Sequence, residues 1–155
     1  MKLIILRGPS GIGKTTYIKN NFPEAIADGT VCSADHYFND LVTGTYKFDP
    51  TKLGAAHQTC KTKVESLLAD HSANNADYVV VDNTNLRQKE IKPYVDLAEK
   101  YDIPYEIITL QAPLELFLKR NVHNVPEDVV KGMYQRMMSV KLPSEWNQRI
   151  VMVGS

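Results

Sequence analysis

The sequence predicts an α/β fold of three layers, in which helices cover both faces of a central, mostly parallel sheet of about five strands. Two observations predict it. Short apolar runs alternate along the chain with stretches of helical periodicity. The middle runs are nearly continuous in apolar residues, as strands buried on both faces are. Because 155 residues suffice for one hydrophobic core, we expect a single domain over residues 1–153.

Each strand and helix has a local signal. The expected strands are Lys2–Leu6, Thr30–Ser33, Tyr78–Asp82, Tyr105–Leu110 and Arg149–Val153. Asp49 followed by Pro50 combines a capping residue with a proline suited to the first helical turn. Pro113 and Pro126 are each expected at the start of a further helix. These signals predict that strands and helices alternate.

Helical periodicity marks the faces that should pack on the sheet. The two expected apolar stripes are Leu53, Ala56, Cys60, Val64, Leu67 and Leu68, and Val129, Val130, Met133, Met137 and Met138. The methionines are interpreted as core filling. Over residues 83–101 the assignment stays open, because Pro93 either starts a helix or kinks one.

The composition limits the classes of function. Lys plus Arg and Asp plus Glu number 18 each, so the net charge is zero. A broad basic surface for coating nucleic acid is therefore excluded, although a local basic pocket could hold a strand end. Lys61, Lys63 and Lys89 are interpreted as solvated. Cys32 and Cys60 lack metal-binding spacing, and we expect buried or half-buried thiols in a reducing compartment rather than a disulfide.

No apolar run is long enough for a signal peptide or a membrane span. We therefore expect a cytoplasmic protein that does not bind membranes. The sequence does not indicate an oligomeric state.

Residues 8–15, reading G-P-S-G-I-G-K-T, match the phosphate-binding motif G-x-x-x-x-G-K-[ST]. The motif lies between an apolar run and an uninterrupted helical pattern, which is the setting it requires. Loop amides and a helix N-terminus would face the phosphates, Lys14 would reach the β- and γ-phosphates, and the Thr15 hydroxyl would ligate Mg²⁺. The alternative is a glycine-rich turn without a ligand. The expected ATP-binding residues are Gly8, Ser10, Gly11, Ile12, Gly13, Lys14, Thr15 and Thr16.

Polar clusters also follow the second and third strands, at residues 33–36 and 82–85. Ligands of parallel sheets bind beyond the carboxyl ends of the strands, so these clusters and the glycine loop should share one crevice. Asp82 closes an apolar run and could hold Mg²⁺ with Thr15, or it could simply cap a turn. Asp35 could act as a general base toward a hydroxyl nucleophile, but spacing alone favours an ordinary turn aspartate.

Four blocks of the sequence resemble the P-loop polynucleotide 5′-hydroxyl kinases and the small stand-alone ATP-binding proteins grouped with them. The blocks are Gly8–Thr16, Ser33–Phe38, Val81–Leu86 and Glu115–Pro126. Residues 46–50, with Ala56 and His57, resemble the second branch in particular. The likeness runs from Lys2 to about Met138. It implies a three-layer P-loop kinase fold with a short helical lid.

The resemblance also implies a function and a set of roles. It implies an ATP- and Mg²⁺-dependent kinase that phosphorylates the 5′-hydroxyl of an RNA or DNA end. An arginine in the lid would stabilise the charge that spreads over the transferring phosphoryl group. The implied roles are general base for Asp35, ATP and Mg²⁺ ligands for Lys14 and Thr15, acceptor contacts for Asn83 and Thr84, and the lid arginine for Arg120.

The sequence departs from the viral polynucleotide kinases on the acceptor side. Phe38 stands where they carry an arginine, and the lid has His123 and Asn124 in place of a second arginine. The aromatic loop, residues 36–48, could stack bases or could cover the core.

Two other functions stay open. One is a kinase of a nucleoside, nucleotide or other small alcohol. The other is an ATP-binding switch or interaction module without an acceptor. The base-reading motif N-K-x-D of GTPases is absent from the sequence.

Overall fold

A computed structural model describes residues 1–9, 11–38, 49–73, 75–119 and 126–153. Its five strands form one sheet in the order β2-β3-β1-β4-β5, and every adjacent pair is parallel. The strands are β1 (Lys2–Arg7), β2 (Val31–Cys32), β3 (Tyr78–Asp82), β4 (Tyr105–Gln111) and β5 (Gln148–Met152). All five predicted strands are confirmed to within one residue at each end.

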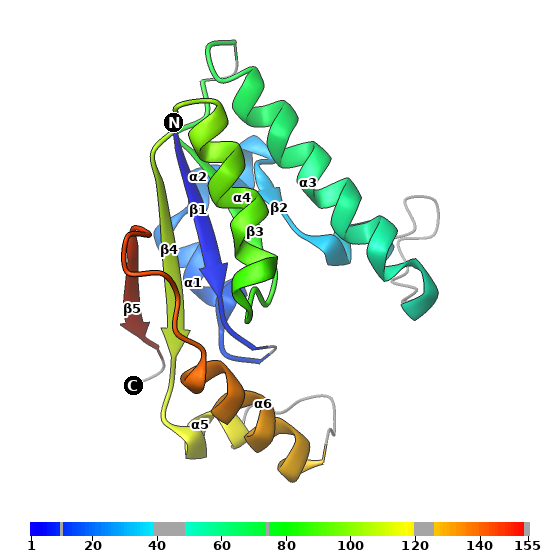
Figure 1. Ribbon diagram of the computed structural model, residues 1–155, viewed down its shortest axis with the longest axis vertical. Coiled ribbons are helices and arrows are strands. Elements are labelled where there is room, and N and C mark those ends of the chain that lie inside the picture. Colours follow the sequence, from blue (N-terminus) through cyan, green and yellow to red (C-terminus); the bar gives the residue numbers. More distant parts are fainter. Residues whose placement is uncertain (10, 39–48, 74, 120–125, 154–155) are drawn as a thin grey trace.

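Helices cover both faces of this sheet (Figure 1). The pair α3 and α4 lies on one face, α1 and α2 lie on the other, and α5 and α6 lie near the carboxyl ends of the strands. The α-helices are α1 (Lys14–Asn21), α2 (Pro23–Asp28), α3 (Leu53–Ala69), α4 (Gln88–Lys100), α5 (Leu114–Lys119) and α6 (Glu127–Ser139), and the short 3₁₀ helices are η1 (Ala34–Phe38) and η2 (Pro50–Lys52).

The central strand β1 shows why its sequence is continuously apolar. Leu3 and Ile5 belong to the core beneath α3 and α4, whereas Ile4 and Leu6 belong to the core beneath α1 and α2. All four side chains are at most 1% exposed. Because successive side chains of a strand point to opposite faces, a strand covered on both sides needs apolar residues at every position.

Among the described side chains, the predicted helix stripes are confirmed except at one position of each, and the side chain of Met138 lies outside the described ones. Leu53 is 41% exposed and Val129 is 48% exposed. Leu53 is the first residue of α3, at the end of the helix that extends past the sheet (Figure 1). Val129 is adjacent to the buried Val130, and neighbours about 100° apart on a helix cannot both face the core. The stripe positions that are buried are Ala56, Cys60, Val64, Leu68, Val130 and Met137.

Helix α4 answers the question that the sequence left open, because it continues from Gln88 to Lys100 with Pro93 inside it.

Asp49 caps the start of η2 as predicted, since its Oδ1 accepts a hydrogen bond from the Thr51 amide at 3.0 Å. Within the described ranges, no helix has the length and apolar character needed to cross a membrane.

Candidate active site

The glycine loop between β1 and α1 has the backbone that its glycines require. Gly11 and Gly13 have φ angles of +85° and +106°, a region that residues with a Cβ rarely adopt. Gly8 is needed for a different reason, because a Cβ there would lie 2.9 Å from Cγ2 of Ile12. The Ile12 side chain is fully buried in the core, so only its backbone could serve a nucleotide. Ser10 lies outside the described residues.

Lys14 begins α1 and folds back over the loop. Its Nζ donates hydrogen bonds to the carbonyl oxygens of Gly8, at 2.8 Å, and Pro9, at 3.3 Å. Burial lowers the pKa of Lys14, and the nearby charges of Asp82 and Asp35 partly oppose this effect. No side chain of the described residues caps the N-terminus of α1. The loop therefore offers a half-buried cation and helix amides to an anion.

Residues that follow the first three strands of the sequence lie close together. Thr15 of α1, His36 of η1 and Asp82 of β3 line a single pocket of about 430 Å³. Asp35 follows directly from β2, and its charge acts on both Lys14 and Asp82. The arrangement brings one residue of each predicted cluster to one pocket at the carboxyl edge of the sheet, although Thr84 and Asn85 line a different cavity.

Asp82 and Thr15 fit a magnesium ion. Asp82 Oδ1 is buried and has no hydrogen-bond partner among the described residues. Burial raises the pKa of Asp82, and the charges of Lys14 and His36 oppose that effect. An unpaired buried carboxylate oxygen is costly unless a cation binds it. Carboxylate and hydroxyl oxygens suit Mg²⁺, which commonly uses one or two protein ligands together with substrate phosphates.

Hydrogen bonds of the backbone position Asp35 at the start of η1. Ser33 Oγ accepts a hydrogen bond from the Asp35 amide at 3.1 Å, and Asn83 Oδ1 accepts one from the Ala34 amide at 2.9 Å. These two bonds fix the first turn of η1 against the end of β3. The Asp35 side chain is exposed at the crevice edge, where it could approach a hydroxyl group.

Asn83 and Thr84, both predicted acceptor contacts, differ in their surroundings. Asn83 is 9% exposed, and its Nδ2 contacts Tyr94 Oη at 3.5 Å and Cys60 Sγ at 3.6 Å. Its amide is therefore engaged inside the protein, where it supports the start of η1. Thr84 is half-buried and lines a second cavity, between α3 and α4. The role of each toward an acceptor stays a prediction.

Thr84 and Asn85 connect the end of β3 to the glycine loop and to β1 through hydrogen bonds. The Thr84 carbonyl accepts a hydrogen bond from the Gly8 amide at 3.0 Å. Asn85 adopts a φ of +48°, and its Nδ2 donates to the Leu6 carbonyl at 2.7 Å. Asparagine tolerates this left-handed conformation better than most residues do. Residues 82–85, reading D-N-T-N, thus include the candidate metal ligand Asp82 and form hydrogen bonds with η1, the glycine loop and β1.

Several predicted site residues lie outside the described part of the chain. They are Ser10, Tyr46, Phe48, Arg120, His123 and Asn124, and their roles stay predictions. Phe38 is buried and packs with Ala34 and Ala56, so it covers the core. Tyr37 is 41% exposed, and its ring meets that of Phe38 edge-on at 5.4 Å.

Both cysteines are free and buried, as predicted. Burial raises the pKa of the Cys32 thiol to about 12, so it stays protonated and unreactive at neutral pH.

Arg7 is a site residue that the sequence interpretation missed. It ends β1, is 5% exposed, and donates to the carbonyl oxygens of Leu86 at 2.9 Å and Met137 at 3.3 Å. Its Nη1 also lies 3.5 Å from Thr109 Oγ1. Burial lowers the pKa of Arg7, and Glu90 opposes this. Arg7 thereby links the strand before the glycine loop to the β3–α4 loop and to the end of α6. The signal in the sequence that could have identified Arg7 is a charged residue at the end of an otherwise apolar strand.

We expect Arg7→Met to lower the free energy of unfolding by about 2–3 kcal/mol, because the carbonyl oxygens of Leu86 and Met137 lose hydrogen bonds from a charged donor. In a domain of this size, Tm should fall by roughly 5–10 °C. Arg149→Met is the matched control, since Arg149 is exposed and pairs with Glu106 at 3.0 Å, and its effect should stay within about 0.5 kcal/mol. Equal Tm values for the two variants would show that the Arg7 contacts do not stabilise the fold.

Comparison with known proteins identifies relatives of the chain. A family profile described as an AAA domain (AAA_33) matches residues 3–140. The chain is 31% identical over 150 residues to human NEDD4-binding protein 2 and 26% identical over 155 residues to the L-seryl-tRNA(Sec) kinase of Methanococcus maripaludis. These alignments include 90% and 94% of this chain, but the chain spans only 8% and 56% of the length of the two relatives.

Solved structures share the fold. The structure of AvrRxo1-ORF1 with AvrRxo1-ORF2 and ATP has a TM-score of 0.65 and 23% sequence identity, covering 89% of this chain and 47% of that one. Kinases are among the other structures with this fold. The predicted α/β P-loop kinase fold is therefore confirmed. Of the predicted lid, residues 115–126, the structure describes residues 115–119 within α5 and Pro126 at the N-cap of α6, but not residues 120–125.

Proposed function

Because this chain belongs to the AAA domain family whose profile spans residues 3–140, we propose that it is an ATP- and Mg²⁺-dependent kinase. Its proposed acceptor is the 5′-hydroxyl of an RNA or DNA end. The observation that carries the proposal is the meeting of Lys14, Asp82 and Asp35, three residues from different strand ends, at one edge of the sheet. Asp35 supplies a candidate general base for an acceptor hydroxyl, which a module that only binds ATP does not need.

Each residue has a distinct task in the proposed reaction. Asp35 accepts the proton of the acceptor hydroxyl while the hydroxyl oxygen attacks the γ-phosphorus. The bond between the γ-phosphorus and the β–γ bridging oxygen breaks, and ADP leaves. Lys14 and the loop amides stabilise the charge on the phosphates, and Arg120 of the lid is predicted to assist. Mg²⁺ would be held by Thr15 and Asp82 and would neutralise phosphate charge.

One relative supports an acceptor that is attached to nucleic acid. The M. maripaludis relative is named for acting on L-seryl-tRNA(Sec), so its acceptor is an RNA-borne group. A kinase of a small alcohol is the second candidate. The zero net charge and the apolar Phe38 at the acceptor side favour that candidate. The human relative is named for binding a protein, which supports the third candidate, an interaction module.

An acceptor assay tests these candidates against one another. With labelled ATP and Mg²⁺, we expect label on oligonucleotides that carry a 5′-hydroxyl and none on the same strands carrying a 5′-phosphate. Transfer to the 5′-phosphorylated strand would place the reacting hydroxyl elsewhere on the acceptor. Transfer to nucleosides alone would support the small-alcohol kinase, and tight ATP binding without any transfer would support the interaction module.

A further inference from the structure

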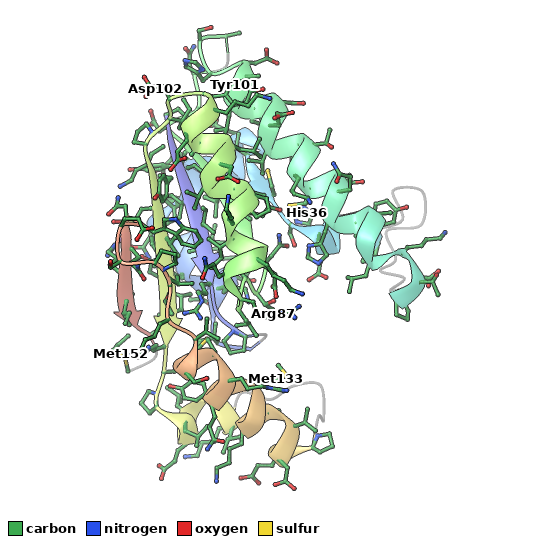
Figure 2. All side chains as sticks on the ribbon, in the orientation of Figure 1. His36, Arg87, Tyr101, Asp102, Met133 and Met152 are labelled. Atoms are coloured by element: carbon green, nitrogen blue, oxygen red, sulfur yellow. The ribbon has the colours of Figure 1, made fainter. Side chains whose placement is uncertain are left out.

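A groove of about 560 Å³ lies between the start of α3 and the segment that joins β3 to α4. Lys61 of α3 contributes to one wall, and Arg87 and Lys89 contribute to the other. Figure 2 shows Arg87 at the end of α4 nearest the glycine loop, with Tyr101 at the opposite end. The groove shares no lining residue with the pocket formed by Thr15, His36 and Asp82.

The charge of this groove is unusual for a chain without net charge. Three cations line it, and Glu90 is its single carboxylate among the described residues. Glu90 already pairs with Arg87 at 2.7 Å. Neither Lys61 nor Lys89 has a carboxylate partner among the described residues. Two uncompensated ammonium groups on opposite walls form a site that favours a flexible polyanion between them.

The groove also leads toward the reaction centre. Thr84 lines it, and the Thr84 carbonyl accepts the hydrogen bond from the Gly8 amide at the start of the glycine loop. Only one residue, Asn83, separates Thr84 from Asp82 in the chain. A ligand in the groove would therefore extend away from the site of transfer, along α3 and α4.

We propose that this groove binds the phosphodiester backbone of the acceptor strand, on the 3′ side of the nucleotide whose 5′-hydroxyl reacts. The inference rests on the proposed function and makes it more specific, because it identifies a strand of several nucleotides as the acceptor. Lys61 and Lys89 contact phosphates from opposite walls, and Thr84 lies at the end of the groove nearest the loop. Phosphate contacts of this kind hold the strand in register without reading its sequence.

The test is strand affinity as a function of salt. A 5′-phosphorylated single strand cannot accept a phosphate at that end, so its binding is measured apart from transfer. The Lys61→Gln/Lys89→Gln double variant removes two phosphate contacts, and the slope of log affinity against log salt should fall by about 1.4. Between 50 and 200 mM salt, the wild-type affinity should therefore drop by roughly sevenfold more than that of the variant.

Two further variants separate this effect from general changes in charge or folding. Lys100→Gln removes a cation at the other end of α4, where Lys100 pairs with Glu65 at 3.3 Å, and should leave the salt slope unchanged. Gly54→Trp fills the groove from α3, where an added Cβ would meet no atom of the described residues within 4 Å. It should weaken strand binding by about tenfold or more while Tm is maintained.

The acceptor assay then distinguishes failure of this inference from failure of the proposed function. Transfer to oligonucleotides with a salt slope equal in wild type and double variant would overturn the groove assignment and leave the kinase proposal standing. Strand binding that depends on Lys61 and Lys89, without transfer to any strand, would support the groove and overturn the kinase proposal. Unchanged strand affinity in Gly54→Trp would also contradict the groove assignment.

Discussion

Asp35→Asn is expected to slow phosphoryl transfer by about 10²–10⁴-fold, the usual contribution of a general base. The amide has the size of the carboxylate but cannot accept the hydroxyl proton. The backbone amides of Ala34 and Asp35 donate hydrogen bonds to Asn83 and Ser33, and the substitution leaves both of these bonds in place. Single-turnover transfer to a 5′-hydroxyl strand measures the rate, and calorimetric titration measures ATP binding, which should change by no more than a few-fold.

Two comparisons make this result specific. Asp28→Asn, at the exposed end of α2, should leave the transfer rate near that of the wild type. A parallel loss of ATP affinity in Asp35→Asn would indicate that Asp35 supports the nucleotide site rather than the acceptor. A transfer rate near wild type in Asp35→Asn would mean that another group, or no group, acts as the base.

The fold was predictable because its signals are local in the sequence. Each strand is an apolar run, and β1 needs apolar residues on both faces because Leu3 and Ile4 pack into different halves of the core. The glycine loop was predictable for the same reason, since Gly11 and Gly13 hold left-handed conformations that the motif requires. Parallel strands then bring Thr15 and Asp82 to one edge without further information.

The orientations of neighbouring polar residues were not predictable in this way. Asn83 and Thr84 are adjacent, yet the Asn83 amide turns inward to Cys60 and Tyr94, and Thr84 lines the groove. The partners of Asn83 lie 23 and 11 residues away in the chain, so no local pattern contains them.

The contacts of Arg7 and the basic groove depend on residues that lie still farther apart in the sequence. Arg7 bonds to residues 79 and 130 positions away. Lys61 and Lys89 belong to different helices and were interpreted as solvated, because only the packing of α3 beside α4 places them around one groove.

Asp82→Asn is expected to change stability and activity in opposite directions. Burial raises the pKa of Asp82 in the folded protein, so ionisation of this carboxyl costs free energy in the fold at neutral pH. Removing the charge should raise Tm of the metal-free protein by about 2–4 °C, roughly 1 kcal/mol for a domain of this size. The same change removes a proposed Mg²⁺ ligand and should slow transfer by about 10²-fold or more.

The pH dependence shows whether ionisation of Asp82 stabilises or destabilises the fold. A carboxyl whose folded pKa is raised destabilises the fold above that pKa and has no such cost below its unfolded pKa. The difference in Tm between Asp82→Asn and wild type should therefore shrink as the pH falls through the acidic range. Thermal unfolding without ligand, with ATP and with Mg²⁺-ATP measures both effects, and Mg²⁺ should add to the stabilisation by ATP in the wild type but not in Asp82→Asn.

A matched carboxylate shows whether the effect belongs to burial at this site. Asp96 is exposed and pairs with Lys92 at 2.9 Å, so Asp96→Asn should lower stability by at most about 0.5 kcal/mol and keep the response to Mg²⁺. A lower Tm for metal-free Asp82→Asn at neutral pH would show that the Asp82 charge stabilises the fold. Asp82 would then be a structural partner of Lys14, and the unpaired Oδ1 would have to be explained without a cation.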